Sequence, residues 1–130
     1  MGYTFGNTSK QRLDTAHKDL REVMEAAIKT SPVDFSIVCG HRTEEAQMEA
    51  LEKGYSQVPW PLSRHNMYPS TAVDVCPYVD GKLVWDDDEL WEKLFHHIMK
   101  TAIRLNIRLL WGGSWTFVDK PHFQLDWRLT

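Results

Sequence analysis

The sequence predicts an α+β fold, a single domain in which two to three helices pack on a small, mostly antiparallel sheet. Two long segments carry apolar residues at helical spacings of three and four. Between and after them lie short apolar runs bounded by glycine or proline, which favour strands. Because a domain averages about 150 residues, the chain of 130 residues is expected to form one domain over positions 1–130.

The N-terminal quarter of the chain is predicted to be a long helix followed by a strand. Apolar residues recur at spacings of three and four over residues 9–30, and Pro32 ends this pattern. The run Phe-Ser-Ile-Val-Cys at 35–39 then predicts a short strand that ends at Gly40.

A second helix and a long loop are expected next. Thr43 and the acidic residues after it are typical of a helix N-terminus, and Gly54 is typical of a helix end, so the helix should span residues 43–53. Residues 55–71 contain three prolines and few periodic apolar residues, which predicts a long ordered loop. Loops longer than about 12 residues in compact domains are often functional.

The C-terminal half is predicted to contain a hairpin, a long helix and two final strands. Residues 72–76 are a strand candidate, and the turn Asp80-Gly81 leads into a second strand at 82–85. An acidic run opens a strongly amphipathic helix over residues 86–105. The last strands are expected at 108–111 and 122–125.

Composition and charge argue against two classes of protein, disordered proteins and nucleic-acid-binding proteins. Hydrophobic residues make up 42% and charged residues 25% of the chain, which is too apolar for a disordered protein. Fifteen basic residues against 18 acidic ones give a net charge of −3. This balance argues against nucleic-acid binding, which depends on neutralising phosphates.

The cysteines and the apolar runs indicate where the protein is made. Two cysteines, Cys39 and Cys76, cannot form a disulfide framework, and we interpret both as small buried residues of a reduced protein. No apolar run is long enough for a secretory signal or a membrane span. We expect synthesis in a cytoplasm without a signal peptide, and no stable membrane association.

Two histidines and one aspartate are candidates for a metal site. His65 and His122 lie where loops meet strands, and Asp74 lies in a predicted strand. Two histidines and one carboxylate are a familiar ligand set for catalytic zinc. Spacing alone leaves open that they are surface or hydrogen-bonding residues. The remaining helical histidines are interpreted as structural or exposed, namely His17, His96 and His97.

Several separated motifs, in order, resemble a family of zinc peptidases that act on peptidoglycan. The motifs are Gly40-His41-Arg42-Thr43, Ser63-Arg64-His65, Ala72-Val73-Asp74, Trp111-Gly112-Gly113 and Asp119-x-x-His122. The family includes D-alanyl-D-alanine carboxypeptidases, vancomycin-resistance D,D-dipeptidases and phage endolysins that are L-alanyl-D-glutamate peptidases. The resemblance spans about residues 36–125 and implies the hedgehog/D,D-peptidase-like variety of the α+β fold.

The sequence departs from the family pattern at two places. The pattern S-x-H-x-x-G-x-A-x-D is two residues longer here between His65 and Asp74, and Ser70 stands where the family often has glycine. Gly113 is followed by Ser114, where the family commonly has aspartate. Neither change removes a ligand, but both affect the expected loop shape and substrate preference.

The resemblance implies a role for each site residue. His65, Asp74 and His122 would bind one Zn²⁺ per chain, and Asp119 would be the general base that takes a proton from water. A turn residue that bonds its own backbone is the alternative for Asp119. Pro121 interrupts regular structure between Asp119 and His122, so both side chains can turn toward one site.

Arg42 and Ser63 are the expected substrate-binding residues. Arg42 matches an arginine that resembles a clamp for a carboxylate or carbonyl, and its planar fork suits that role. The alternative is a surface ion pair at a helix entry. Ser63 would contact either the substrate or a zinc ligand. Three tryptophans are expected near the cleft, at positions 60, 111 and 115.

These observations together predict a zinc metallopeptidase that hydrolyses the peptide stem of peptidoglycan. The expected protein is a monomeric phage endolysin, an L-alanyl-D-glutamate endopeptidase stored in the host cytoplasm and released to the cell wall through a holin-type lesion. The alternatives are a D-alanyl-D-alanine carboxypeptidase or dipeptidase, a non-catalytic zinc-containing cell-wall binding module, and an unrelated α+β domain without metal.

Overall fold

The computed structural model of the chain describes residues 2–126. Its helices and strands form the predicted α+β arrangement, and every strand pair in the sheet is antiparallel. That residues 1–130 form one domain stays a prediction, and its positions 1 and 127–130 lie outside the described residues.

The prediction of one long helix over residues 9–30 is wrong, because the helix is interrupted. It is two helices, α1 (Asn7–Leu13) and α2 (Lys18–Thr30), so the described residues contain four α helices rather than two or three. Between the two helices, the backbone forms hydrogen bonds with Ser70, a residue far away in the sequence. The amide of His17 donates to the Ser70 carbonyl over 2.8 Å, and the Ser70 amide donates to the Thr15 carbonyl over 2.9 Å. These bonds replace helical ones.

The apolar pattern conceals this break because it continues across it. Ala16 lies in the break and is nevertheless buried, as are Leu13 before it and Leu20 after it. His17 then starts α2, since its Nδ1 accepts a hydrogen bond of 3.0 Å from the amide of Asp19. His17 is therefore a helix cap, in keeping with the structural interpretation of this histidine.

The sheet has the strand order β1-β2-β5-β4, and β3 pairs with β2. Its strands are β1 (Phe35–Cys39), β2 (Ala72–Val79), β3 (Lys82–Leu83), β4 (Leu109–Trp111) and β5 (His122–Leu125). The predicted hairpin is confirmed, but β3 is shorter than the predicted 82–85. Val84 donates to the carbonyl of Pro77, and Pro77 has no amide hydrogen to return the bond.

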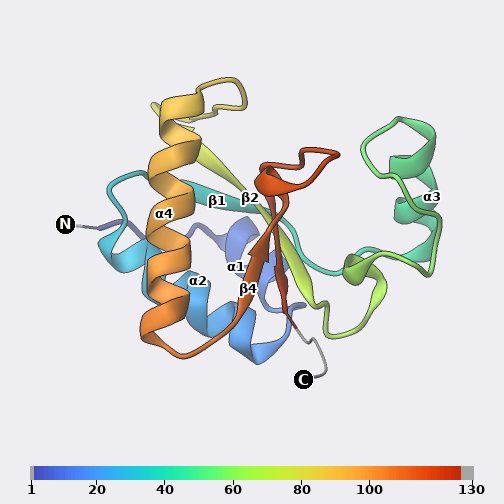
Figure 1. The fold of residues 1–130 in the computed structure, drawn as a ribbon, viewed down its shortest axis with the longest axis horizontal. Helices are drawn as coiled ribbons and strands as arrows, with labels where there is room; N and C mark the ends of the chain where they lie inside the picture. Colours follow the sequence, from blue (N-terminus) through green and yellow to red (C-terminus); the bar gives the residue numbers. More distant parts are fainter. Residues whose placement is uncertain (1, 127–130) are drawn as a thin grey trace.

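Three helices cover one face of the sheet, and the fourth stands apart. Helix α4 (Asp88–Arg104) packs against α2 and against strands β2 and β4, while α1 packs on β1. Figure 1 shows α3 (Glu44–Glu52) at the opposite end of the molecule from α4. The core between the sheet and the three helices is apolar, and its largest buried members include Phe35, Phe123, Leu20, Met24, Ile37, Leu94 and Ile98.

The long loop predicted over residues 55–71 is confirmed, with one short 3-10 helix, η1 (Arg64–Asn66), inside it. The loop returns from α3 to the sheet and so connects the outlying helix to strand β2. Within residues 2–126, no helix has the length and apolar character needed to cross a lipid bilayer.

Candidate active site

Strands β1, β2 and β5 carry a row of polar side chains across the sheet. Asp74 on β2 is the register partner of Cys39 on β1 and of His122 on β5. Its neighbours Val73 and Val75 are fully buried in the core. Because side chains alternate along a strand, Asp74 points to the opposite face, away from α4. The same alternation on β5 separates His122 from the buried Phe123.

His65 reaches this row from the loop that precedes β2. It lies in η1 and is 2% exposed. Ser63 caps the short helix, because its Oγ accepts a bond of 3.2 Å from the His65 amide. The ring is oriented by Nδ1, which lies 2.8 Å from the carbonyl oxygen of Gly40. Since a carbonyl only accepts, Nδ1 carries the hydrogen and Nε2 presents its lone pair.

Two imidazole nitrogens converge on one oxygen of Asp74. Nε2 of His65 lies 3.2 Å from Oδ1 of Asp74, and Nδ1 of His122 lies 3.4 Å from the same atom. The outer nitrogen of His122, Nε2, is occupied by Oε1 of Gln124 at 2.9 Å. Because the outer nitrogen of each ring donates a hydrogen bond, the inner nitrogens, Nε2 of His65 and Nδ1 of His122, both point a lone pair toward the anionic oxygen of Asp74. Such a set of acceptors requires a cation, either a proton or a metal ion.

The pKa values of these groups reflect the same concentration of charge. Burial disfavours the charged form of His65, but the Asp74 carboxylate outweighs burial and raises the pKa of His65 to about 10. Burial likewise acts to raise the pKa of Asp74, and the two histidines overcome it and hold that pKa well below its ordinary value. The carboxylate therefore stays ionised and draws positive charge to its half-buried position.

Asp119 lies at the rim of this cluster. Its Oδ2 is 3.9 Å from Nδ1 of His122. Burial, followed by repulsion from the Asp74 carboxylate, raises the pKa of Asp119 above its ordinary value. The amide of Asp119 donates to the carbonyl of Gly112 over 2.9 Å. A side chain at position 112 would collide with the Asp119 carbonyl, so the first glycine of Trp-Gly-Gly allows this close approach.

Arg42 is held beside the same carboxylate by a buried amide. Its Nη2 lies 3.5 Å from Oδ2 of Asp74, and its Nη1 donates to Oε1 of Gln47 over 2.9 Å. Gln47 is fully buried, and its Nε2 donates to Ser56 Oγ and to the Val58 carbonyl, each at 2.8 Å. The arginine is thus a fixed group in the site rather than a surface ion pair.

Of the three tryptophans expected near the cleft, one lines it. Trp115 lines the cleft, and its ring centroid lies 5.0 Å from that of His122. Trp111 instead stacks on Phe95, with ring centroids 3.9 Å apart, because its indole nitrogen bonds the Lys120 carbonyl and fixes the ring in the packing layer. Trp60 does not belong to the cleft lining either.

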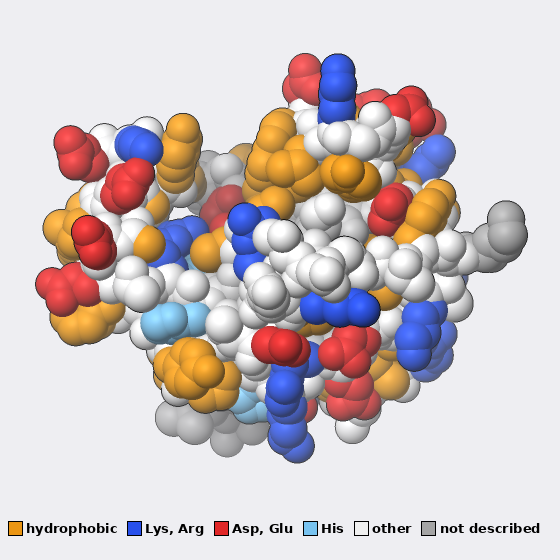
Figure 2. All heavy atoms as spheres, turned by 180° about the vertical axis from the view of Figure 1, so that it is seen from behind, with side chains coloured by type: hydrophobic (Ala, Val, Ile, Leu, Met, Phe, Trp, Pro, Cys, Tyr) orange, Lys and Arg blue, Asp and Glu red, His pale blue; other side chains and the backbone are white. Residues whose placement is uncertain are grey.

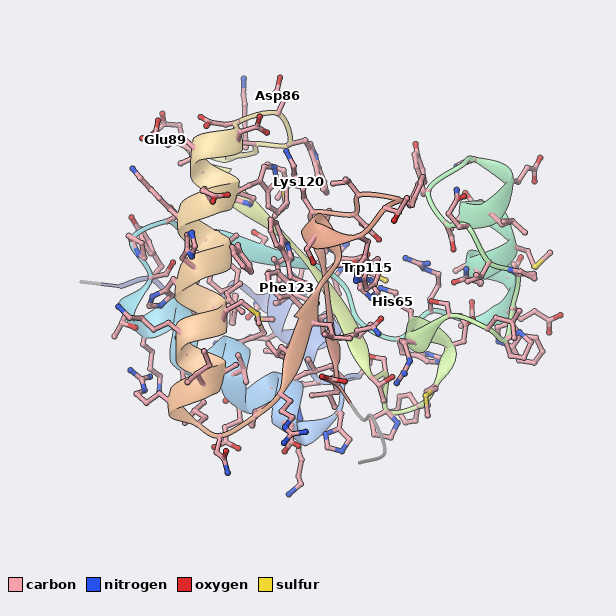
Figure 3. All side chains as sticks on the ribbon, in the orientation of Figure 1. His65, Asp86, Glu89, Trp115, Lys120 and Phe123 are labelled. Atoms are coloured by element: carbon pink, nitrogen blue, oxygen red, sulfur yellow. The ribbon has the colours of Figure 1, made fainter. Side chains whose placement is uncertain are left out.

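An open cleft contains all of the predicted site residues. It has a volume of about 1020 Å³ and is lined by the end of β1, by α3, by the loop before β2 and by residues 115–124. Viewed from behind, the acidic α3 segment is separated from the body by a hollow in which basic side chains are visible (Figure 2). His65 and Trp115 lie between the sheet and α3 (Figure 3).

Two residues of this site are not among those predicted from the sequence. Gln47 lies in the helix predicted over residues 43–53, but no local pattern marks its bond to Arg42, which precedes the helix cap Thr43. Cys39 was interpreted as a buried structural cysteine, yet its Sγ forms a group with His65 and Asp74 whose ligand atoms all lie within 4.8 Å of one another. This group could hold a metal ion.

The chain is similar in sequence and in fold to known proteins. Residues 1–126 match the sequence model of a family described as phage L-alanyl-D-glutamate peptidase. The chain is 31% identical over 125 residues to the L-alanyl-D-glutamate peptidase of Escherichia phage T5. The matched region covers 96% of this chain and 90% of that protein. It is also similar to the crystal structure of the Serratia marcescens L-Ala D-Glu endopeptidase ChiX, with a TM-score of 0.81, 32% identity, and coverage of 95% of this chain and 90% of that one.

Proposed function

Because the chain belongs to the phage L-alanyl-D-glutamate peptidase family, we propose that it hydrolyses the bond between L-alanine and D-glutamate in the peptide stem of bacterial peptidoglycan. The observation that carries this proposal is the convergence of His65, Asp74 and His122 at one point of a cleft, with Asp119 beside them. An open cleft of about 1020 Å³ has room for a bound peptide.

We propose Zn²⁺ as the ion, bound by His65, Asp74 and His122, one per chain. Two imidazoles and one carboxylate are donors that zinc prefers, and a set of three protein ligands is typical of catalytic rather than structural zinc. Bonds from the outer nitrogens to Gly40 and Gln124 support the choice, because they orient both rings inward. When bound, zinc would supply Lewis acidity that polarises the scissile carbonyl and acidifies water.

Asp119 is proposed as the general base. Its side chain is about one third exposed, so it can reach both water and a bound peptide. It would accept the proton of the attacking water and deliver it to the leaving amine of D-glutamate. Burial, followed by repulsion from the Asp74 carboxylate, keeps the pKa of Asp119 raised, which makes Asp119 a better proton acceptor than an ordinary aspartate.

Arg42 is proposed to anchor the substrate. Its guanidinium lies within the cleft lining and is already oriented by Gln47. The D-glutamate residue of the stem carries a free carboxylate, which a fixed guanidinium can pair through two parallel hydrogen bonds. Ser63 Oγ accepts a hydrogen bond from the backbone amide of His65, and Ser63 also lines the cleft. We therefore propose Ser63 as a residue that positions His65.

Mass spectrometry of purified peptidoglycan after digestion tests the reaction. New N-terminal D-glutamate is expected, whereas release of D-alanine would identify a D-alanyl-D-alanine carboxypeptidase.

Elemental analysis of dialysed protein tests the metal, with one zinc per chain expected for the native protein and loss of zinc for His65→Ala and His122→Ala. His96→Ala is the matched control, because His96 is exposed on α4 and pairs only with Glu92 among its described ion pairs. Zinc without cleavage of any stem peptide would indicate a binding module.

We further propose that the enzyme acts as a monomer on the cell wall after release from the host cytoplasm through a holin-type lesion. A holin-deficient lysis assay tests this route, since the enzyme should then accumulate without lysis and lyse the cells when the membrane is permeabilised. Lysis without permeabilisation would indicate another route of export.

A further inference from the structure

Cys39 occupies the end of the same row that carries Asp74 and His122. Its register partner across the β1–β2 pair is Asp74, and the register shifts between Ile37 and Cys39. Ile37 is fully buried in the core, so regular alternation would point Cys39 into the core as well. The bulge interrupts the alternation, and Val38 and Cys39 both line the cleft.

The thiol lies within the donor group of the site. The Sγ atom of Cys39 and the ligand atoms of His65 and Asp74 are all within 4.8 Å of one another. The hydrogen bond from Sγ to the Gly40 carbonyl is long, at 3.6 Å, and that carbonyl already accepts a bond of 2.8 Å from His65. The thiol therefore lies beside His65 and Asp74, and Oδ1 of Asp74 lies 3.4 Å from Nδ1 of His122.

We propose that Cys39 is a fourth protein donor to the metal site, and that soft divalent cations such as Cd²⁺ are held by Cys39 together with His65, Asp74 and His122. This inference depends on the metal site proposed above. Thiolate sulfur prefers soft ions, while two imidazoles and one carboxylate suffice for zinc. As Sγ binds the ion, the thiol releases its proton to solvent. Four protein donors leave a tetrahedral ion without an open position, so the soft-metal form is closed to substrate.

The test is ultraviolet absorbance of the protein loaded with Cd²⁺ in a thiol-free reductant. A thiolate ligand to Cd²⁺ produces a charge-transfer band, which imidazole and carboxylate ligands do not produce. We expect one Cd²⁺ per chain and this band in the native protein. The band should be lost in both Cys39→Ala and Cys39→Ser.

The second cysteine provides a matched control. Cys76 is fully buried, and its Sγ lies 3.4 Å from the Val84 carbonyl, away from the donor group. The Cys76→Ala variant should therefore keep the band, and far-ultraviolet circular dichroism verifies that each variant is folded. A band that disappears in folded Cys76→Ala and remains in Cys39→Ala would refute the assignment.

Two further outcomes separate this inference from the proposed function. If native protein binds one Cd²⁺ without the band, Cys39 is not a ligand and the metal site stands. If it binds neither Cd²⁺ nor Zn²⁺, the metal site is wrong and the inference fails with it. A band that persists in folded Cys39→Ala would place the thiol–metal contact elsewhere and would also overturn the inference.

Discussion

Nη1 of Arg42 donates a hydrogen bond of 2.9 Å to Oε1 of Gln47, which is fully buried. The amide of Gln47 also accepts a bond of 3.2 Å from Asn66 Nδ2 and donates to Ser56 and Val58. One side chain therefore connects the arginine of the cleft to α3, to the loop after it and to the helix that carries His65. All of its hydrogen-bonding capacity is used.

Replacing Gln47 is expected to affect both stability and substrate binding. Gln47→Leu leaves buried donors and acceptors unpaired, which should lower the free energy of unfolding by about 1–3 kcal/mol. The variant should also raise KM, because Arg42 loses its support. Urea unfolding and stem-peptide kinetics measure the two effects. Gln47→Glu retains an acceptor for Arg42 and should show the smaller rise in KM; equal KM values for Gln47→Leu and native protein would show that Gln47 does not orient Arg42.

Arg42→Lys should lower kcat/KM by about 10- to 100-fold, because hydrogen bonds to charged groups contribute about 1.5–3 kcal/mol and lysine lacks the planar fork. Lysine cannot reach both Gln47 and Asp74 with separate nitrogens, as Nη1 and Nη2 of the arginine do. Zinc content and the unfolding midpoint serve as controls and should remain near native values. An unchanged kcat/KM on stem peptide would remove Arg42 from the substrate site.

Asp119→Ala should lower kcat by roughly 10²- to 10⁴-fold, the usual contribution of general acid–base catalysis. Metal binding should persist, because the Asp119 carboxylate lies 3.9 Å from His122 Nδ1, whereas Asp74 is 3.4 Å from it. Single-turnover hydrolysis and elemental analysis are measured on the same preparation. Loss of zinc would make Asp119 a ligand, and full activity would place the base elsewhere.

Ser63→Ala tests whether this serine acts on substrate or on His65. The hydroxyl accepts a bond from the His65 amide, and outer-shell partners of ligands typically contribute 10- to roughly 100-fold in metal affinity or activity. We expect zinc affinity, measured by chelator competition, to fall in Ser63→Ala and to be restored in Ser63→Thr, which keeps the hydroxyl. A higher KM with unchanged zinc affinity would assign Ser63 to substrate binding instead.

The buried thiol of Cys76 should make stability depend on alkaline pH. Burial raises the pKa of Cys76 from 9.0 to about 12. The folded state therefore favours the protonated thiol, and its contribution is present below pH 9.0 and is lost as the pH rises toward 12. The difference in unfolding free energy between native protein and Cys76→Ala, measured by urea titration, should shrink over this range. A difference that stays constant would show that the thiol has the same pKa in both states.

The sequence by itself determined the strands and the faces on which the proposed ligands Asp74 and His122 lie. Alternation in Ala72-Val73-Asp74-Val75 places Asp74 opposite two core valines, and alternation in β5 does the same for His122 beside Phe123. The loop over residues 55–71 was also predictable, since its prolines and lack of periodicity are local properties of the chain. These features depend on residues close together in the sequence, so a local sequence pattern can predict them.

Only the tertiary structure decided three other features. The break between α1 and α2 depends on backbone bonds to Ser70, which lies in another part of the chain. The turn of Cys39 toward the cleft depends on a bulge that the run Phe-Ser-Ile-Val-Cys does not mark. The role of Gln47 depends on four partners from three segments. In each case the feature depends on contacts between separate segments that the tertiary fold brings together, and local patterns carry no information about which segments will meet.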